Sequence, residues 1–193
     1  MHISDGVLTT PVWTAGYAAS IAIVAFTTRK MRSEDVPKTA IMTSVFFVSS
    51  LIHVPIGPTS VHLLLNGLIG MLLGPLAFIA VFLGLILQAI LFQHGGITTI
   101  GVNTLIMGLP ALLVYKIFDL HKIFSFRLNK AVFGVLAGGS AVFFATLLLA
   151  AFLITTGDAF MGAAKIAALA HLPVMIVEAI ITGVVASFIG KVK

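Results

Sequence analysis

The sequence predicts an all-α fold, a polytopic membrane bundle of about seven transmembrane helices. Two features of its composition lead to this prediction. Hydrophobic residues make up 60% of the 193 residues and charged residues only 9%, whereas about a quarter of a soluble domain is charged. The mean hydropathy is +1.19, and the apolar residues fall into runs that are long enough to cross a bilayer. Together these features exclude a soluble globular domain.

The apolar runs follow one another from near the N-terminus to the C-terminus, without a linker or repeat. The third is short for a helix that crosses a core of ~30 Å, so it is tilted, continuous with the preceding IGPTS stretch, or only partly membrane-crossing. We therefore expect a single integral membrane domain over residues 1–193. The expected spans are Pro11–Thr28, Thr39–Ile56, Val61–Leu73, Leu76–Phe92, Asn103–Phe118, Ala131–Thr155 and Ala164–Ile189.

The basic residues predict the orientation of these spans. All lysines and arginines except Lys165 fall on one side of the seven-span arrangement, which the positive-inside rule assigns to the cytoplasm. The C-terminus is then cytoplasmic and the N-terminus lies outside. The net charge of +5 follows from this distribution and does not indicate a nucleic-acid partner. Because no basic residue precedes Arg29, we expect no signal peptide, and the N-terminus is expected to survive in the mature protein.

The first six residues, MHISDG, contain a group that can chelate a metal ion. The free amine of Met1, the backbone nitrogen of His2 and the His2 imidazole can close two fused rings on one ion. Three nitrogens in nearly one plane suit Ni(II) or Cu(II), with Co(II) lower in the order of affinity. The alternative is that His2 is a solvated terminal residue without a function.

A second candidate segment is HVPIGPTSVHLLLNG, whose loop lies on the same outer side as the N-terminus. Gly57–Pro58 indicates a turn, and Thr59 or Ser60 can cap a helix that begins near His62. His62 can supply a fourth nitrogen to the metal, and His53 is a weaker candidate for the same role. Alternatively, either imidazole only bonds a free backbone carbonyl.

Two other segments carry polar residues next to or within spans. FQHGGITTIGVNTLIMG is a glycine-rich outer loop in which Gln93, His94, Thr98, Thr99 and Asn103 can line a polar cavity, with His94 and Asn103 supporting the site rather than binding the ion. In AHLPVMIVEAIITG, His171 and Glu178 are two helical turns apart and share one face. A carboxylate within a span is costly, so Glu178 with His171 is expected to be a structural polar clamp rather than a ligand.

Four ordered motifs over the whole chain, MHISDG, GPTSVHLLLNG, FQHGGITTIGVNT and HLPVMIVEAIITG, resemble the CbiM/NikM family. The members of this family are substrate-capturing membrane components of energy-coupling-factor transporters for cobalt and nickel. The resemblance implies an N-terminus inserted into the fold from outside and a square-planar site made by Met1, His2 and His62. Asp5 would hold the terminal segment in place, and the GPTS loop, with Ser60, and the QHGG loop would cover the site.

The resemblance also implies partners: a membrane coupling (T) subunit, a pair of cytoplasmic ATP-binding subunits and, for the cobalt type, a small two-span auxiliary subunit. The chain contains neither a P-loop nor an HExxH motif, so we expect a transport component rather than an enzyme, with no organic cofactor and with Co(II) or Ni(II) as the transported substrate. The loop motifs resemble the cobalt branch, whereas planar nitrogen ligands favour nickel. The main alternative is an ion-coupled secondary metal transporter that acts without ATPase subunits.

Overall fold

The computed structural model describes residues 1–51, 53–56, 59–124, 126 and 128–192. The described residues form seven α-helices and one antiparallel hairpin of two strands, so the all-α membrane fold is confirmed. The hairpin consists of β1 (His53–Ile56) and β2 (Thr59–His62). The helices are α1 (Thr10–Thr28), α2 (Val36–Ser49), α3 (Asn66–Leu73), α4 (Ala77–Phe92), α5 (Ile100–Asp119), α6 (Asn129–Thr156) and α7 (Met161–Val192).

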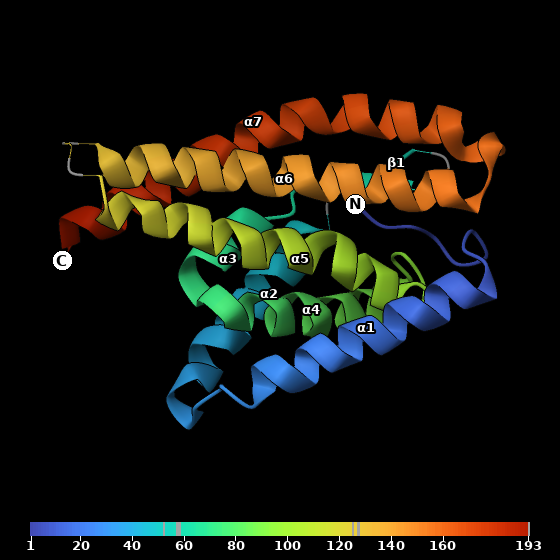
Figure 1. The fold of residues 1–193 in the computed structure, drawn as a ribbon, viewed down its shortest axis with the longest axis horizontal. Helices are drawn as coiled ribbons and strands as arrows, with labels where there is room; N and C mark the ends of the chain where they lie inside the picture. Colours follow the sequence, from blue (N-terminus) through green and yellow to red (C-terminus); the bar gives the residue numbers. More distant parts are fainter. Residues whose placement is uncertain (52, 57–58, 125, 127, 193) are drawn as a thin grey trace.

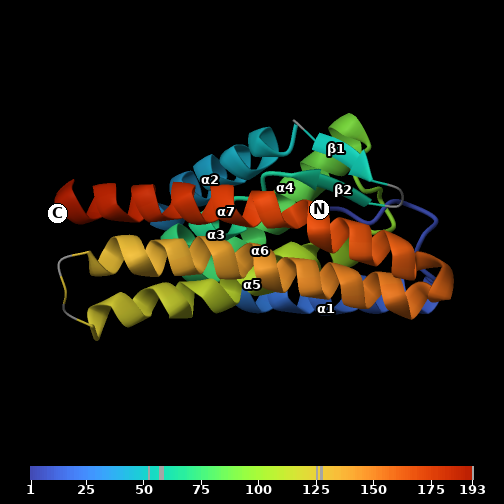
Figure 2. The same cartoon turned by 90° about the horizontal axis from the view of Figure 1, so that it is seen from above.

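The helices run along the long axis of the molecule, with α6 and α7 side by side on one flank and α1 crossing the opposite flank (Figures 1 and 2). One end, called here the hairpin end, carries β1, β2 and the turn between α6 and α7. The other, called here the basic end, carries the C-terminus and a depression lined by Lys38, Lys122 and Lys130. Lys38, Lys122 and Lys130 therefore gather at one end of the bundle, whereas Lys165 lies near the start of α7 at the hairpin end. Arg127 and Lys193 lie outside the described residues.

Five helical stretches of the described chain are long and apolar enough to cross a membrane. Four of them are α1, α5, α6 and α7, and the fifth joins α3 and α4 through the tight turn Gly74–Leu76. The spans expected at Pro11–Thr28, Leu76–Phe92, Asn103–Phe118, Ala131–Thr155 and Ala164–Ile189 each correspond to one of α1 and α4–α7. The count of seven crossing helices is not reproduced, because α2 and α3 are too short.

The end of the second expected span and the beginning of the third are strands rather than helix. Helix α2 ends at Ser49, and the apolar residues from His53 onward form β1, because Pro55 interrupts a helix and the flanking Val54 and Ile56 favour extended backbone. Residues Thr59–His62 pair with β1 in register, Thr59 with Ile56 and His62 with His53. Thr59 and Ser60 therefore cap no helix. The turn expected at Gly57–Pro58 lies outside the described residues.

The change from strand to helix at Leu65 depends on a side chain from α7. Leu65 has a left-handed backbone conformation, with φ of 50°, and α3 begins at the next residue without a side-chain cap of its own. The Glu178 carboxylate accepts hydrogen bonds from the Leu64 N–H at 2.5 Å and the Leu65 N–H at 2.6 Å. Glu178 thus satisfies two backbone donors that an isolated helix start would leave free.

Small residues let the helices approach closely. A Cβ atom on Gly67 of α3 would lie 2.7 Å from Gly138 Cα of α6, and one on Gly138 would lie 2.5 Å from the Glu178 carbonyl oxygen of α7. Glycines are therefore required where α3, α6 and α7 meet. Close backbone approach of this kind replaces hydrophobic expulsion as the source of helix association in lipid.

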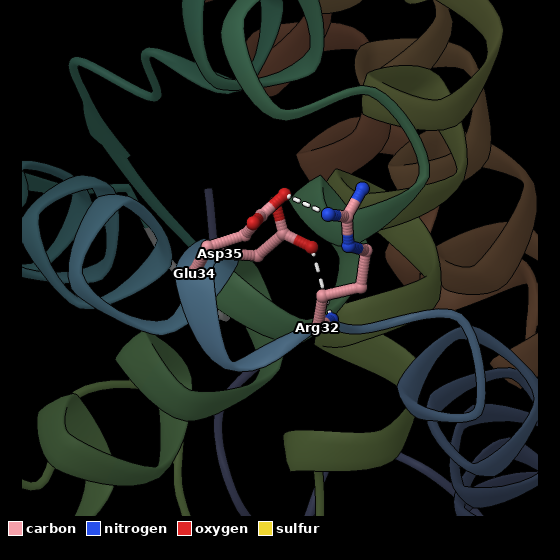
Figure 3. A network of polar contacts seen from close by, with 3 residues as sticks. All are labelled: Arg32, Glu34 and Asp35. Atoms are coloured by element: carbon pink, nitrogen blue, oxygen red, sulfur yellow. Dashed lines mark hydrogen bonds and ion pairs between the residues drawn. The ribbon is translucent and has the colours of Figure 1, made fainter.

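The connection between α1 and α2 is a short polar turn at the basic end of the bundle (Figure 3). The Asp35 carboxylate accepts the Arg32 N–H at 3.0 Å, and the Arg32 guanidinium contacts Glu34 at 2.6 Å. Because Arg32 and Glu34 are both exposed, this ion pair adds little stability. The turn reverses the chain so that α2 packs against α4.

Substitutions at two adjacent glycines of α6 test how closely this helix packs against α7. We expect Gly138→Ala to lower the thermal unfolding temperature in detergent, because its Cβ would overlap the Glu178 carbonyl oxygen, and overpacking costs about 1–3 kcal/mol. Gly139→Ala is the matched control, since its Cβ would lie 3.5 Å from the nearest side-chain atom, Ala179 Cβ. Equal unfolding temperatures for the two variants would contradict close packing at Gly138.

Candidate metal centre

The N-terminal segment is buried inside the bundle. Met1 and Ile3 are 0% exposed and His2 is 2% exposed, and the segment reaches from the hairpin end toward the middle of the molecule (Figure 1). Ile3 forms a β-bridge with Thr59 of β2. The chain terminus is thus packed among the helices rather than exposed to solvent.

The side chain of Asn103, in the first turn of α5, both accepts a hydrogen bond from the backbone of this segment and donates one to it. Its side-chain oxygen accepts the Ile3 N–H at 2.8 Å, and its side-chain amide donates to the Ile3 carbonyl at 3.1 Å. The amide also donates to the Thr99 hydroxyl at 3.1 Å. Asn103 therefore positions the residue that follows His2.

Asp5 attaches the same segment to the loop that precedes α5. Its carboxylate accepts the Ile97 N–H at 3.1 Å, the Thr98 N–H at 3.0 Å and the Thr98 hydroxyl, and the Asp5 N–H donates to the Gly95 carbonyl at 2.8 Å. Gly95 and Gly96 have φ of +79° and +130°, and a Cβ on Gly96 would overlap the Asp5 carboxylate. The two glycines are needed both for the backbone conformation and for the space that Asp5 occupies.

The imidazoles of His2 and His62 approach each other through one nitrogen of each ring. His62 Nδ1 lies 2.7 Å from the Leu63 carbonyl, and His2 Nε2 lies 2.6 Å from the Gln88 side-chain amide. Because a backbone carbonyl only accepts hydrogen bonds, Nδ1 carries the hydrogen of a neutral His62 ring. The remaining nitrogens, His62 Nε2 and His2 Nδ1, are 3.1 Å apart.

This separation is the one expected for two ligands of a single metal ion. Nitrogens bound at about 2.1 Å from an ion and at right angles to each other lie about 3 Å apart. Without an ion, the same distance suits a hydrogen bond between the two rings. Among the described residues no group of three or more His, Cys, Asp or Glu side chains is arranged to hold a metal.

Burial favours the neutral forms of the candidate ligands. It lowers the pKa of the Met1 amine well below the ordinary value of 8.0, although the Glu178 carboxylate acts in the opposite direction. Burial also lowers the pKa of His2 and of His62 well below 6.5, and the nearby amine adds to the decrease in both. Neutral amine and imidazole nitrogens are the forms that bind metal ions.

Gln88 of α4 was missed in the sequence analysis. It holds the orientation of the His2 ring through the 2.6 Å contact with Nε2, as outer partners of metal-binding histidines do. A signal was present, since Gln88 is the only polar residue of the expected span Leu76–Phe92. A single amide in an otherwise apolar run indicates a buried hydrogen-bond partner elsewhere in the protein.

The other predicted residues lie at different distances from this pair. The Ser60 hydroxyl is 3.5 Å from His2 Nδ1, too far for a strong hydrogen bond. The His94 ring centroid lies 6.2 Å from that of His2, and His53 lies beyond it, against His94.

Glu178 and His171 come from α7, where His171 Nδ1 contacts the Ala167 carbonyl at 2.6 Å. Within the described part of the chain, Glu178 Oε2 and His171 Nε2 are buried without a hydrogen-bond partner.

A family model described as the cobalt uptake substrate-specific transmembrane region, CbiM, matches residues 2–193. The chain belongs to the CbiM family. A crystal structure of a protein described as a transition metal transporter superposes on this CbiM-family chain with a TM-score of 0.79 at 28% identity, covering 100% of this chain and 93% of the other. The resemblance found in the sequence is thereby confirmed.

Curated relatives of this CbiM-family chain are named as metal transport proteins. A putative metal transport protein of Haemophilus influenzae is 35% identical over 99% of this chain and 94% of its own length. A putative cobalt transport protein, CbiM 1, of Methanocorpusculum labreanum is 34% identical over 100% and 90%. A putative fused cobalt transport protein, CbiMQ, of the same organism matches 61% of this chain and 21% of its own length at 34% identity.

Replacing Asp5 tests how the N-terminal segment is held. We expect Asp5→Ala to weaken Co(II) and Ni(II) binding about 10–100-fold, the range for partners that orient a metal ligand, because three hydrogen bonds from the loop are lost. Asp5→Asn keeps an oxygen that accepts one of them and should bind at an intermediate level. Equilibrium dialysis of the purified variants measures the effect. Native affinity in Asp5→Ala would show that this attachment does not position the ligands.

The lowered pKa values predict how the stability of the metal-free protein depends on pH. In the unfolded chain the amine and the imidazoles recover values of 8.0 and 6.5, so below these the unfolded state binds more protons than the folded state. The contribution of these groups to the free energy of unfolding is then fully present above about pH 8. It decreases as the pH falls, more steeply below about 6.5. Thermal unfolding between about pH 8.5 and 5.5 measures this. The decrease below 6.5 should be smaller in a His2→Gln, His62→Gln double variant, and a flat native profile would contradict the prediction.

Proposed function

We propose that this chain is the substrate-specific membrane component of an importer for Co(II) or Ni(II). It captures the ion through the Met1 amine, the backbone nitrogen and imidazole of His2, and the His62 imidazole. The observation that supports this most directly is the 3.1 Å separation of two buried ring nitrogens, His2 Nδ1 and His62 Nε2. The family membership supports cobalt or nickel as the substrate.

The proposed ligand set explains why the terminus is buried. The amine and the His2 backbone nitrogen close one chelate ring, and the same backbone nitrogen with His2 Nδ1 closes the second, so three ligands come from two residues. His62 supplies the fourth from a different element, β2. Four nitrogens in a plane suit Ni(II) and Cu(II) best and Co(II) less well. The main-chain nitrogen must lose its proton, so metal binding releases protons.

The whole chain acts in this proposal as one substrate-binding domain of a larger transporter in the cell membrane. Its partners are a membrane coupling (T) subunit, cytoplasmic ATP-binding subunits and a small two-span auxiliary subunit. The name of the fused CbiMQ relative supports an associated transport subunit. The hairpin end faces outward and the basic end faces the cytoplasm, which the gathering of Lys38, Lys122 and Lys130 at the basic end supports.

An ion-coupled carrier would need a carboxylate that can exchange protons or ions within the spans. Glu178 is the one acidic residue of the apolar runs, and its Oε1 is engaged by two backbone donors of the Leu64–Leu65 segment. We therefore assign Glu178, with His171, a structural role. The energy for transport comes from the ATP-binding partners.

Extending the N-terminus tests the capture site. We expect two residues placed before Met1 to weaken Co(II) and Ni(II) binding by more than about 100-fold, beyond the effect of an outer partner, because the amine becomes an amide. His62→Gln should also lose tight binding. His121→Gln at the basic end, where His121 Nδ1 contacts the Phe118 carbonyl at 2.6 Å, is the matched control. Undiminished binding by the extended protein would refute the proposed ligand set.

A further inference from the structure

Four of the six histidines of this chain form a continuous row at the hairpin end. The ring centroids of His62 and His2 are 4.7 Å apart, those of His2 and His94 are 6.2 Å apart, and those of His94 and His53 are 3.8 Å apart. The proposed capture site uses the two buried members of the row. The other two, His94 and His53, lie between that site and the surface.

The hairpin places one histidine at each end of this row. His53 of β1 and His62 of β2 are direct partners in the antiparallel register, and residues opposite each other have their side chains on the same face of the pair. His62 is 3% exposed, whereas His53 is exposed to solvent. The hairpin therefore brings both ends of the row to one face of the strand pair, with His62 buried and His53 exposed.

His94 is fixed relative to the buried site by its backbone. Its N–H donates to the Gln88 carbonyl at 3.2 Å, and the Gln88 side chain holds the His2 ring. The next residue, Gly95, accepts the Asp5 N–H through its carbonyl. The His94 backbone is thus anchored beside the groups that position His2, and its ring lies 6.2 Å from that of His2 and 3.8 Å from that of His53.

We propose that His53 and His94 form a second, weaker site for a divalent cobalt or nickel ion, through which the ion enters toward His2 and His62. The entry role depends on the proposed function, whereas the second site itself does not. Imidazole nitrogens suit these ions, and a site with only two protein ligands leaves the remaining positions to water. Such a site binds weakly enough to release the ion to the four-nitrogen site.

The two rings must open slightly to hold an ion at their nitrogen atoms. Their centroid distance of 3.8 Å leaves no space for an ion between the ring faces. His53 can move, because it is exposed and its Nδ1 has a long contact of 3.4 Å with the Leu51 carbonyl. The pKa of His94 is lowered by partial burial and then by the charges of His53 and the amine, which favours the neutral, metal-binding ring.

The first experiment measures the second site where the tight site is blocked. Protein with two residues before Met1 is titrated with Co(II), and bound metal is determined by equilibrium dialysis and by the visible absorption of the bound ion. We expect one weak site, which is lost in His53→Gln and in His94→Gln and kept in the His121→Gln control. A weak site that persists in both His53→Gln and His94→Gln would overturn the proposal.

The second experiment tests the entry role with the native N-terminus. In stopped-flow measurements with Co(II), His53→Gln should keep the tight site at full occupancy but fill it about tenfold more slowly, within the range by which association rates vary among variants of one site. Association at the native rate in both His53→Gln and His94→Gln would overturn the entry role. If the native protein had no tight site but the extended protein kept a His53-dependent weak one, the proposed function would fail and the second site would stand.

Discussion

A polar chain terminus buried among apolar helices must have its backbone groups satisfied, and much of this structure follows from that requirement. An unpaired N–H or C=O in such a setting costs several kcal/mol. Asn103 bonds both backbone groups of Ile3, Thr59 pairs with Ile3, and the Gly95 carbonyl receives the Asp5 N–H. These partners come from α5, β2 and the loop before α5, so three distant parts of the chain converge on the first five residues.

The same requirement positions the two candidate ligand rings. His62 Nδ1 lies against the Leu63 carbonyl and His2 Nε2 against the Gln88 side chain, so that His62 Nε2 and His2 Nδ1 lie 3.1 Å apart. If these nitrogens bind an ion as proposed, the two rings are already in place and little conformational entropy is lost on binding.

The sequence predicted those parts of the fold in which hydropathy and conformation agree. Helices α1, α4, α5, α6 and α7 are long apolar runs, and their predicted limits differ from the observed ones by a few residues. The segment from His53 to Leu65 also contains apolar residues, but the conformation of its described part depends on Pro55 and on two hydrogen bonds that distant Glu178 accepts. Hydropathy reports burial and not hydrogen bonding, so the hairpin was missed. The capture residues remain predictions, and Gln88 was overlooked although its isolation in α4 could have identified it.

One peptide group joins the candidate metal centre to the middle of α7. The peptide unit between Leu63 and Leu64 accepts the His62 Nδ1 hydrogen on its carbonyl and donates its N–H to Glu178. Because a peptide unit is a rigid plane, its two hydrogen bonds join the His62 ring to α7. If one position of α7 favours a bound ion, the bound ion favours that position of α7 by the same free energy. The candidate metal centre and the longest helix in the described chain are therefore linked through a single peptide group.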